Sequence, residues 1–136
     1  MTQLTKTVAL TSIYFVYLST FLTVSVQKWK SGVPEWFKQQ FQNTLLTSLP
    51  GGITLGFYTI TLLETLVASL FLISLFRLEI LGGSREFMEL GLALSMLTFG
   101  ALGFGLRISN DFQGAANLFM YFGVSGLILL FVRFLA

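Results

Sequence analysis

The stretch that decides the fold is residues 53–76, ITLGFYTITLLETLVASLFLISLF, a long apolar run that contains one charged side chain, Glu64. A helix rises about 1.5 Å per residue, so about 20 mostly apolar residues are needed to cross the hydrocarbon core of a bilayer. The run is long enough to do so. We therefore predict a transmembrane helix over residues 53–76.

Three further segments are long and apolar enough to cross a bilayer, namely residues 8–26, 87–106 and 114–134. The connections after the second and third spans are short, which makes the last three helices antiparallel neighbours. The predicted fold class is all-α, an integral membrane four-helix bundle that forms one domain over residues 1–136.

Composition excludes many classes of protein. The chain has 136 residues, of which 54% are hydrophobic and 10% are charged, whereas a soluble domain has about 25% charged residues. It contains no cysteine and no histidine, which excludes disulfides, Cys/His metal sites and catalytic triads. We therefore expect no metal site. The net charge is +2 and the cations form no basic cluster, so we do not expect nucleic-acid binding.

The first apolar segment is predicted to be a retained helix and not a cleaved signal peptide. Only Lys6 precedes it, the run is longer than a signal-peptide core, and no convincing small-residue cleavage site follows. At the third span, Ser84 is the predicted N-cap and Glu86 lies in the first turn.

The longest connection, residues 27–52, contains a predicted amphipathic helix over residues 34–46. Phe37, Phe41 and Leu45 recur at helical spacing opposite a polar face, and Pro34 suits a first helical turn. Such a helix either lies in the membrane interface or caps the mouth of the bundle.

Four spans place both termini on the same side of a multi-pass protein, which we expect in a prokaryotic cytoplasmic membrane. The positive-inside rule gives no orientation, because four cations fall on each side. Lys6, Arg77, Arg85 and Arg133 lie on one side; Lys28, Lys30, Lys38 and Arg107 lie on the other.

Small residues spaced four apart on the third span permit close helix packing. The pairs are Gly91 with Ser95 and Ala101 with Gly105. The spacing fits packing within one bundle, or a face between copies of the chain.

Glu64 lies about 12 residues into its predicted helix, roughly 18 Å from the start and near mid-bilayer. A bare carboxylate there costs from about 3 to more than 10 kcal/mol. It must therefore be protonated, hydrogen-bonded to hydroxyls, or paired with a cation. We find no cation at matching depth in another span. Lys28 and Arg107 reach Glu64 only if the bundle mouth is sunken or the second helix starts late.

We therefore expect Glu64 to face a hydroxyl-lined pocket inside the bundle. The candidate residues of this polar pocket are Glu64, Lys28, Arg107, Tyr17, Thr20, Ser95 and Tyr121. Two interpretations of Glu64 stay open, a carboxylate that handles protons or a ligand and a polar clamp between helices.

The order of several features resembles a known family. Lys28 ends the first span, Pro34 and a Leu49–Pro50 pair mark the connection, and Glu64 lies within LLETLVASLFLISL. This arrangement resembles the DoxX/DoxD-like family of small four-helix membrane proteins.

The resemblance implies a membrane subunit or accessory protein of a larger, quinone- or redox-linked assembly. Its partners would be the lipid bilayer and either other membrane subunits or a second copy, and quinone is the cofactor it suggests. The missing catalytic side chains favour a protein without activity of its own. The alternative is a small-molecule or proton-handling protein centred on Glu64, and a third reading is a quinone-reactive enzyme.

Overall fold

The computed structural model describes residues 2–48, 51–82 and 84–134. Within these ranges the chain forms α-helices and short 3₁₀ helices (η), with no strand. The elements are α1 (Gln3–Ser31), α2 (Glu35–Phe41), η1 (Leu45–Ser48), α3 (Gly52–Phe76), η2 (Glu79–Leu81), α4 (Glu86–Ile108) and α5 (Phe112–Phe134). The helices α1, α3, α4 and α5 are long and apolar enough to cross a membrane, which confirms the predicted all-α class.

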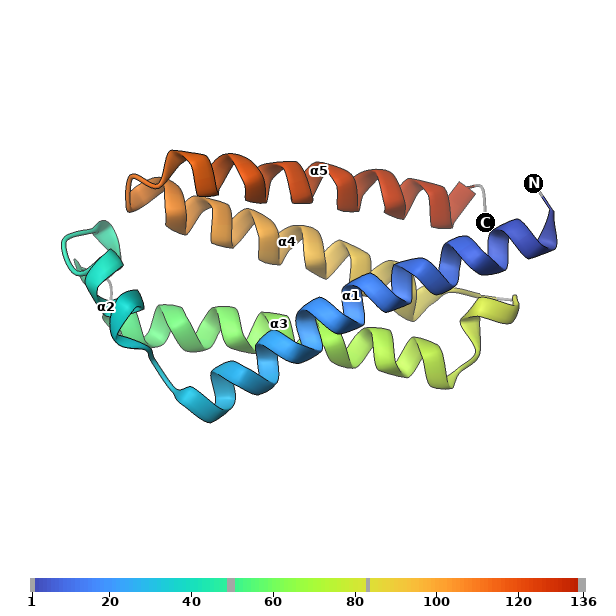
Figure 1. Cartoon of the computed structure of the whole chain (residues 1–136), viewed down its shortest axis with the longest axis horizontal. Helices are drawn as coiled ribbons and strands as arrows, with labels where there is room; N and C mark the ends of the chain where they lie inside the picture. Colours follow the sequence, from blue (N-terminus) through green and yellow to red (C-terminus); the bar gives the residue numbers. More distant parts are fainter. Residues whose placement is uncertain (1, 49–50, 83, 135–136) are drawn as a thin grey trace.

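Helices α3, α4 and α5 lie side by side and run antiparallel, while α1 crosses obliquely over α3 (Figure 1). Helix α1 begins and α5 ends at the same end of the molecule. From there the two helices diverge toward the end that carries α2 (Figure 1). This divergence separates α1 from α5 in the half of the bundle that holds Glu64.

Helix α1 is longer than the predicted span 8–26. Thr2 caps its start by accepting a hydrogen bond from the Thr5 backbone N–H at 3.1 Å. Its end is set by Gly32, whose φ of 68° suits glycine and whose N–H bonds to the Lys28 carbonyl. Hydropathy measures only the apolar run, whereas the helix continues through polar residues that also favour helix.

The amphipathic helix is shorter than predicted. It spans Glu35–Phe41 and not residues 34–46, with Pro34 as its N-cap, and η1 follows. The hydroxyl of Thr44 donates to the Phe41 carbonyl at 2.8 Å. Such local side-chain bonds compete with helix continuation.

The predicted N-cap of the third span was also wrong. Arg85 occupies the N-cap position of α4, and its side chain makes no capping bond. The first backbone N–H groups are bound instead by a carboxylate from η2, that of Glu79. Glu86 does lie in the first turn, as predicted.

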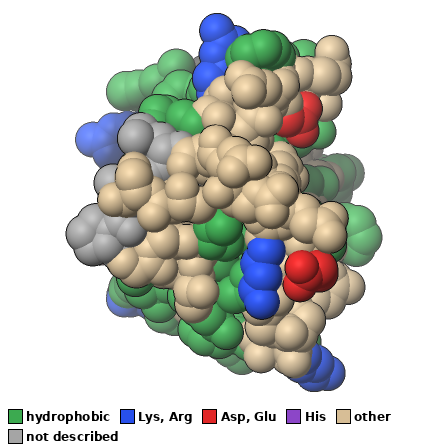
Figure 2. Space-filling view, turned by 90° about the vertical axis from the view of Figure 1, so that its left-hand side faces the viewer, with side chains coloured by type: hydrophobic (Ala, Val, Ile, Leu, Met, Phe, Trp, Pro, Cys, Tyr) green, Lys and Arg blue, Asp and Glu red, His purple; other side chains and the backbone are tan. Residues whose placement is uncertain are grey.

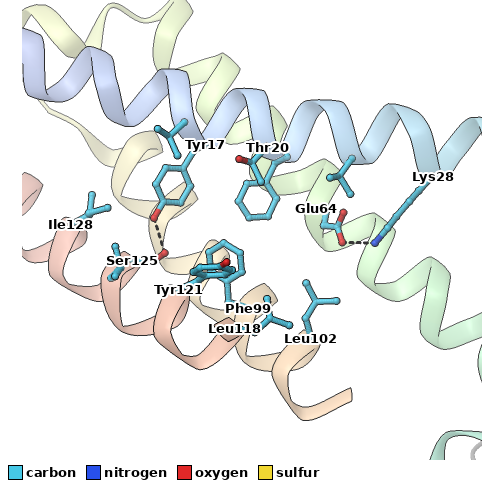
Figure 3. A pocket seen from close by; sticks show the side chains of 14 residues that line it. Tyr17, Thr20, Lys28, Glu64, Phe99, Leu102, Leu118, Tyr121, Ser125 and Ile128 are labelled. Atoms are coloured by element: carbon cyan, nitrogen blue, oxygen red, sulfur yellow. Dashed lines mark hydrogen bonds and ion pairs between the residues drawn. The ribbon is translucent and has the colours of Figure 1, made fainter. Parts of the chain in front are cut away.

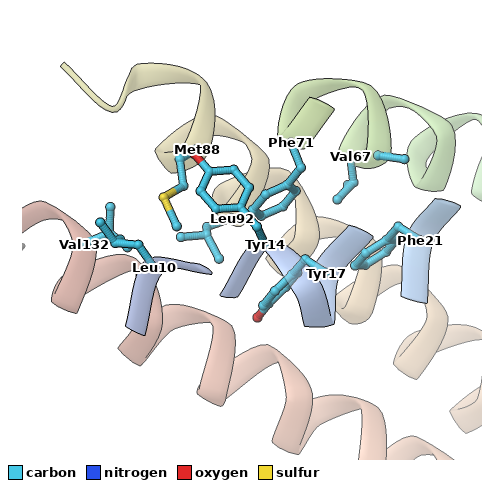
Figure 4. Packing of buried hydrophobic residues seen from close by; sticks show 10 residues of the cluster. Leu10, Tyr14, Tyr17, Phe21, Val67, Phe71, Met88, Leu92 and Val132 are labelled. Atoms are coloured by element: carbon cyan, nitrogen blue, oxygen red, sulfur yellow. The ribbon is translucent and has the colours of Figure 1, made fainter. Parts of the chain in front are cut away.

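The packed core lies toward the end with the chain termini. Fully buried side chains from all four long helices meet there, including Leu10, Phe71, Leu92 and Val132 (Figure 4). The rings of Tyr17 and Phe71 stack with centroids 5.2 Å apart.

The surface fits a protein that contacts lipid. Large apolar side chains such as Phe15, Phe76 and Leu127 are exposed along the long helices, as in a lipid-facing surface. At the end that carries α2, Figure 2 shows much backbone and many uncharged, non-hydrophobic side chains, with charged side chains of both signs and some hydrophobic ones among them. The helices therefore fit a multi-pass membrane protein with water at this end.

The small residues of α4 pack inside the bundle. A Cβ atom on Gly91 would lie 3.0 Å from the Phe71 ring, and one on Gly105 would lie 3.7 Å from the Phe41 ring. These contacts support the interpretation of packing within one bundle.

Candidate functional site

Glu64 is buried near the middle of α3, with 3% of its surface exposed. It lies on the face of the helix that also carries the buried residues Thr61 and Ala68. This face packs toward α1 and α4, so the carboxylate points into the bundle, as predicted. The expected hydroxyl partners are absent: within the described residues, no hydroxyl binds either carboxylate oxygen.

The partner of Glu64 is Lys28 of α1. The Lys28 Nζ donates to Glu64 Oε1 at 2.7 Å, and the ammonium lies 5.6 Å from the centre of the Phe57 ring. The expectation that no cation lies at matching depth was wrong. Helix α1 continues to Ser31 and crosses α3 obliquely, which brings Lys28 down beside the carboxylate.

Neighbouring contacts hold this crossing in place. The indole Nε1 of Trp29 donates to the Thr65 hydroxyl at 2.8 Å, and the Trp29 ring lies 5.8 Å from that of Tyr58. These bonds join the last turns of α1 to α3 and keep Lys28 within reach of Glu64.

The second carboxylate oxygen of Glu64 differs from the first, which binds Lys28. Within the described residues, Glu64 Oε2 is fully buried and no hydrogen-bond donor reaches it; Ser25 Oγ, one turn before Lys28, is in the same state. A buried polar atom without a hydrogen bond costs about 1–3 kcal/mol. A molecule that donates a hydrogen bond to this oxygen would recover that free energy.

A cavity of about 540 Å³ lies beside the pair, between α1 and α5. We call it the lateral cavity (Figure 3). Its walls are α1 between positions 16 and 28, α5 between positions 118 and 128, Phe99 and Leu102 of α4, and Glu64. Val16 and Val124 line it yet are 55% and 47% exposed, so the cavity opens sideways toward lipid.

Polar groups are spaced along this otherwise apolar cavity. The hydroxyls of Tyr17 and Ser125 bond to each other at 2.6 Å at the end away from Lys28 (Figure 3). Thr20 and Tyr121 also line it. The rings of Tyr17, Phe99 and Tyr121 make much of the wall aromatic.

The structure brings together five of the seven predicted pocket residues. Glu64, Lys28, Tyr17, Thr20 and Tyr121 all line the lateral cavity.

The other two predicted residues lie elsewhere. Ser95 is buried and donates to the Gly91 carbonyl of its own helix at 2.8 Å. Arg107 is exposed, with its guanidinium 4.8 Å from the Phe112 ring centre. Depth along a helix could be estimated from the sequence, whereas the direction in which each side chain points could not.

A second cavity, of about 490 Å³, lies under α2. We call it the mouth cavity. It is bounded by Trp36, Phe37 and Phe41 of α2, by α3 between positions 52 and 60, and by α4 between positions 101 and 108. Lys28 also lines it, so the lysine lies between the two cavities.

A second buried carboxylate is that of Glu79, in η2. It is 4% exposed. Ser74, whose hydroxyl is also bonded to that of Tyr14, donates to its Oε1 at 2.6 Å. The backbone N–H groups of Met88 and Phe87 bind its two oxygens at 3.0 and 3.3 Å. Both oxygens are satisfied, so Glu79 joins η2 to α4 and offers no free acceptor.

The arrangement offers a hydrogen-bond donor and acceptor pair at one end of a ring-lined, apolar cavity. Within residues 2–48, 51–82 and 84–134, no three metal-ligating side chains come together. At this site, Lys28 and Glu64 can form hydrogen bonds, hold opposite charges and exchange protons.

Comparison with protein-family models, with curated proteins and with solved structures finds no match. The resemblance to the DoxX/DoxD-like family stays a prediction from the quoted residues. Two of these residues, Lys28 and Glu64, form the ion pair, and Pro34 is the N-cap of α2. Leu49 and Pro50 lie outside the described residues.

Proposed function

We propose that this protein binds a small amphiphile from the bilayer in the lateral cavity and holds the polar head of that molecule at Lys28 and Glu64. The observation that carries the proposal is Glu64 Oε2, a buried acceptor without a partner among the described residues. The head should therefore donate a hydrogen bond, as a hydroxyl does.

The lateral cavity suits such a molecule. Its volume of about 540 Å³ falls within the range of roughly 300–1,000 Å³ typical of small-molecule sites. Its apolar walls would hold a hydrocarbon body, and its opening between α1 and α5 would admit a molecule directly from lipid.

The acidic side chains that line the lateral cavity favour ligand binding over a proton relay. Among the described residues, Glu64 is the one acid that lines the lateral cavity, so a relay would lack a second carboxylate there. A proton taken up by Glu64 would also weaken its bond to Lys28.

The role implied by the family resemblance is the second candidate. The aromatic side chains of Tyr17, Phe99 and Tyr121 in the lateral cavity would suit a quinone ring, since rings stack or meet edge to face. Trp36 on α2 is 62% exposed and offers a contact for another membrane subunit. Co-purification of such a subunit that is lost in Trp36→Ala would support this candidate.

The test of the proposed function is native mass spectrometry with two added probes, nonylphenol and its methyl ether nonylanisole. The probes share an apolar body, but only the phenol donates a hydrogen bond. We expect the wild type to retain the phenol at least about tenfold better, equivalent to roughly 1.4 kcal/mol. Glu64→Gln should lose most of this preference, while Glu89→Gln, which removes an acid outside the cavity, should keep it.

Thermal unfolding of the same variants separates a ligand site from a clamp. If Glu64→Gln loses the phenol while its stability stays within about 1 kcal/mol of wild type, the binding function is supported. If it costs several kcal/mol and wild type never retains either probe, Glu64 is a clamp between helices.

A further inference from the structure

We infer that the mouth cavity is a second station for the same amphiphile, joined to the lateral cavity by movement of the Lys28 side chain. The inference rests on the proposed function, and it adds a route from the hydrocarbon region to the polar end of the molecule. The route begins between α1 and α5 and ends under α2.

The two cavities share a wall. Lys28 and Leu102 line both of them. Glu64 lines the lateral cavity and holds the Lys28 ammonium at 2.7 Å. The ion pair therefore lies at the boundary between the cavities, and the lysine stem is part of the barrier.

This barrier can move. The Lys28 side chain is 22% exposed and has a flexible four-carbon stem. Besides bonding to Glu64, the Lys28 ammonium lies over the face of the Phe57 ring. The Phe57 ring in turn packs 5.2 Å from Phe37, a residue of the mouth cavity. The ammonium could therefore swing along an aromatic surface toward the mouth.

A ligand can drive this movement without leaving Glu64 unpaired. A donor that enters the lateral cavity can bond to Oε2, which has no partner among the described residues. Once it is bound, Lys28 can release Oε1 while the carboxylate keeps a hydrogen bond. This exchange avoids the large cost of a buried carboxylate with no partner.

The mouth cavity fits the same class of occupant. Its volume of about 490 Å³ is close to that of the lateral cavity, and its walls are similarly apolar and aromatic. Gln40 stands at its edge and donates to Ser109 at 3.2 Å. An apolar body could lie in this cavity with its head near Lys28 or near this polar edge.

The natural absence of cysteine permits a direct test with single-cysteine reporters. Thr20→Cys reports on the lateral cavity and Thr59→Cys on the mouth cavity. Ser12→Cys, on an exposed part of α1 that lines neither cavity, is the control. Each is combined with Lys28→Ala/Glu64→Gln or with Lys28→Met/Glu64→Gln. Both backgrounds remove the ion pair, and they differ only in side-chain volume at position 28.

The reporters are labelled in proteoliposomes with a charged, membrane-impermeant thiol reagent on both sides. We expect Thr59→Cys to react in both backgrounds and Ser12→Cys in neither. Thr20→Cys should react at least about tenfold faster with alanine than with methionine at position 28, because the shorter side chain leaves space for water between the cavities. Equal rates at Thr20→Cys, or an unreactive Thr59→Cys, would overturn the joined route.

The second station is tested by protection with nonylphenol in the chain that keeps Lys28 and Glu64, with a membrane-permeant thiol reagent that reaches Thr20→Cys from the lipid. We expect the phenol to slow labelling at both Thr20→Cys and Thr59→Cys. Protection at Thr20→Cys alone would leave the proposed function standing and remove the second station. Protection at neither reporter would remove both.

Discussion

Lys28 and Glu64 form a part-buried ion pair, whose contribution to stability is the difference between mutual attraction and the cost of desolvation. Removing Lys28 leaves the Glu64 carboxylate buried without a cation, whereas Glu64→Gln leaves an ammonium that is 22% exposed and an amide oxygen that can still accept from it. We expect Lys28→Met, which keeps most of the side-chain volume, to lower the free energy of unfolding by about 3–5 kcal/mol. Unfolding in mild detergent measures this loss.

Two control variants test the cause of the loss in Lys28→Met. The double variant Lys28→Met/Glu64→Leu removes both charges and should recover most of the lost stability. Glu89→Gln breaks the exposed pair with Arg133, whose atoms are 3.2 Å apart, and should change stability by less than about 1 kcal/mol. If Lys28→Met were as mild as Glu89→Gln, the buried pair would contribute little.

Glu79 gives a second prediction at the scale of single residues. Its carboxylate binds the first N–H groups of α4 from a different element, and it also binds Ser74. Glu79→Ala should cost about 1–3 kcal/mol and speed amide exchange at the start of α4, because these donors lose their partner inside the bundle. Glu86 is an exposed acid in the first turn of α4, and Glu86→Ala should cost at most about 1 kcal/mol. Equal losses of stability in the two variants would contradict a capping role for Glu79.

At the scale of elements, contact between α4 and α5 depends on Gly103. A Cβ atom there would lie 2.6 Å from the Phe119 ring, whereas one on Gly100 would lie 3.8 Å from Phe122. Gly103→Ala should therefore push the helices apart and cost about 1–3 kcal/mol. Gly100→Ala should be neutral or stabilise by up to about 1 kcal/mol, because alanine favours helix. Thermal unfolding of both variants measures the difference. Equal effects of the two substitutions would contradict a close contact at Gly103.

The predicted helix bounds agree with the structure for three long helices and differ for the short one. The spans 53–76, 87–106 and 114–134 were predicted to within two residues of α3, α4 and α5, because long apolar runs have one stable form in lipid. The predicted helix 34–46 instead ends at Phe41. Its stop depends on the local Thr44 hydrogen bond, which periodicity does not detect.

At the scale of the whole molecule, four spans should alternate in direction across the membrane. Single cysteines at Thr2 and Ser84 are expected to react with an impermeant reagent from one side, and those at Ser31 and Ser109 from the other. Labelling of oriented membrane vesicles measures this alternation. Reaction of Thr2→Cys and Ser109→Cys from the same side would contradict four complete spans.

By itself, the sequence determined that this is an all-helical chain with four membrane-length spans and a carboxylate turned inward at Glu64. These conclusions follow from apolar length and from the cost of a charge in lipid, both of which are properties of local sequence. It also placed Tyr17, Thr20 and Tyr121 at suitable depths for the pocket.

Only the tertiary structure decided which side chain pairs with Glu64 and which cavity lies beside it. The oblique crossing of α1 over α3 brings Lys28 to the carboxylate, and the divergence of α1 from α5 opens the lateral cavity beside it. The same packing turns Ser95 and Arg107 away from that cavity. Crossing angles and side-chain directions arise from contacts between helices distant in the chain, such as Trp29 with Thr65, and no single helix encodes them.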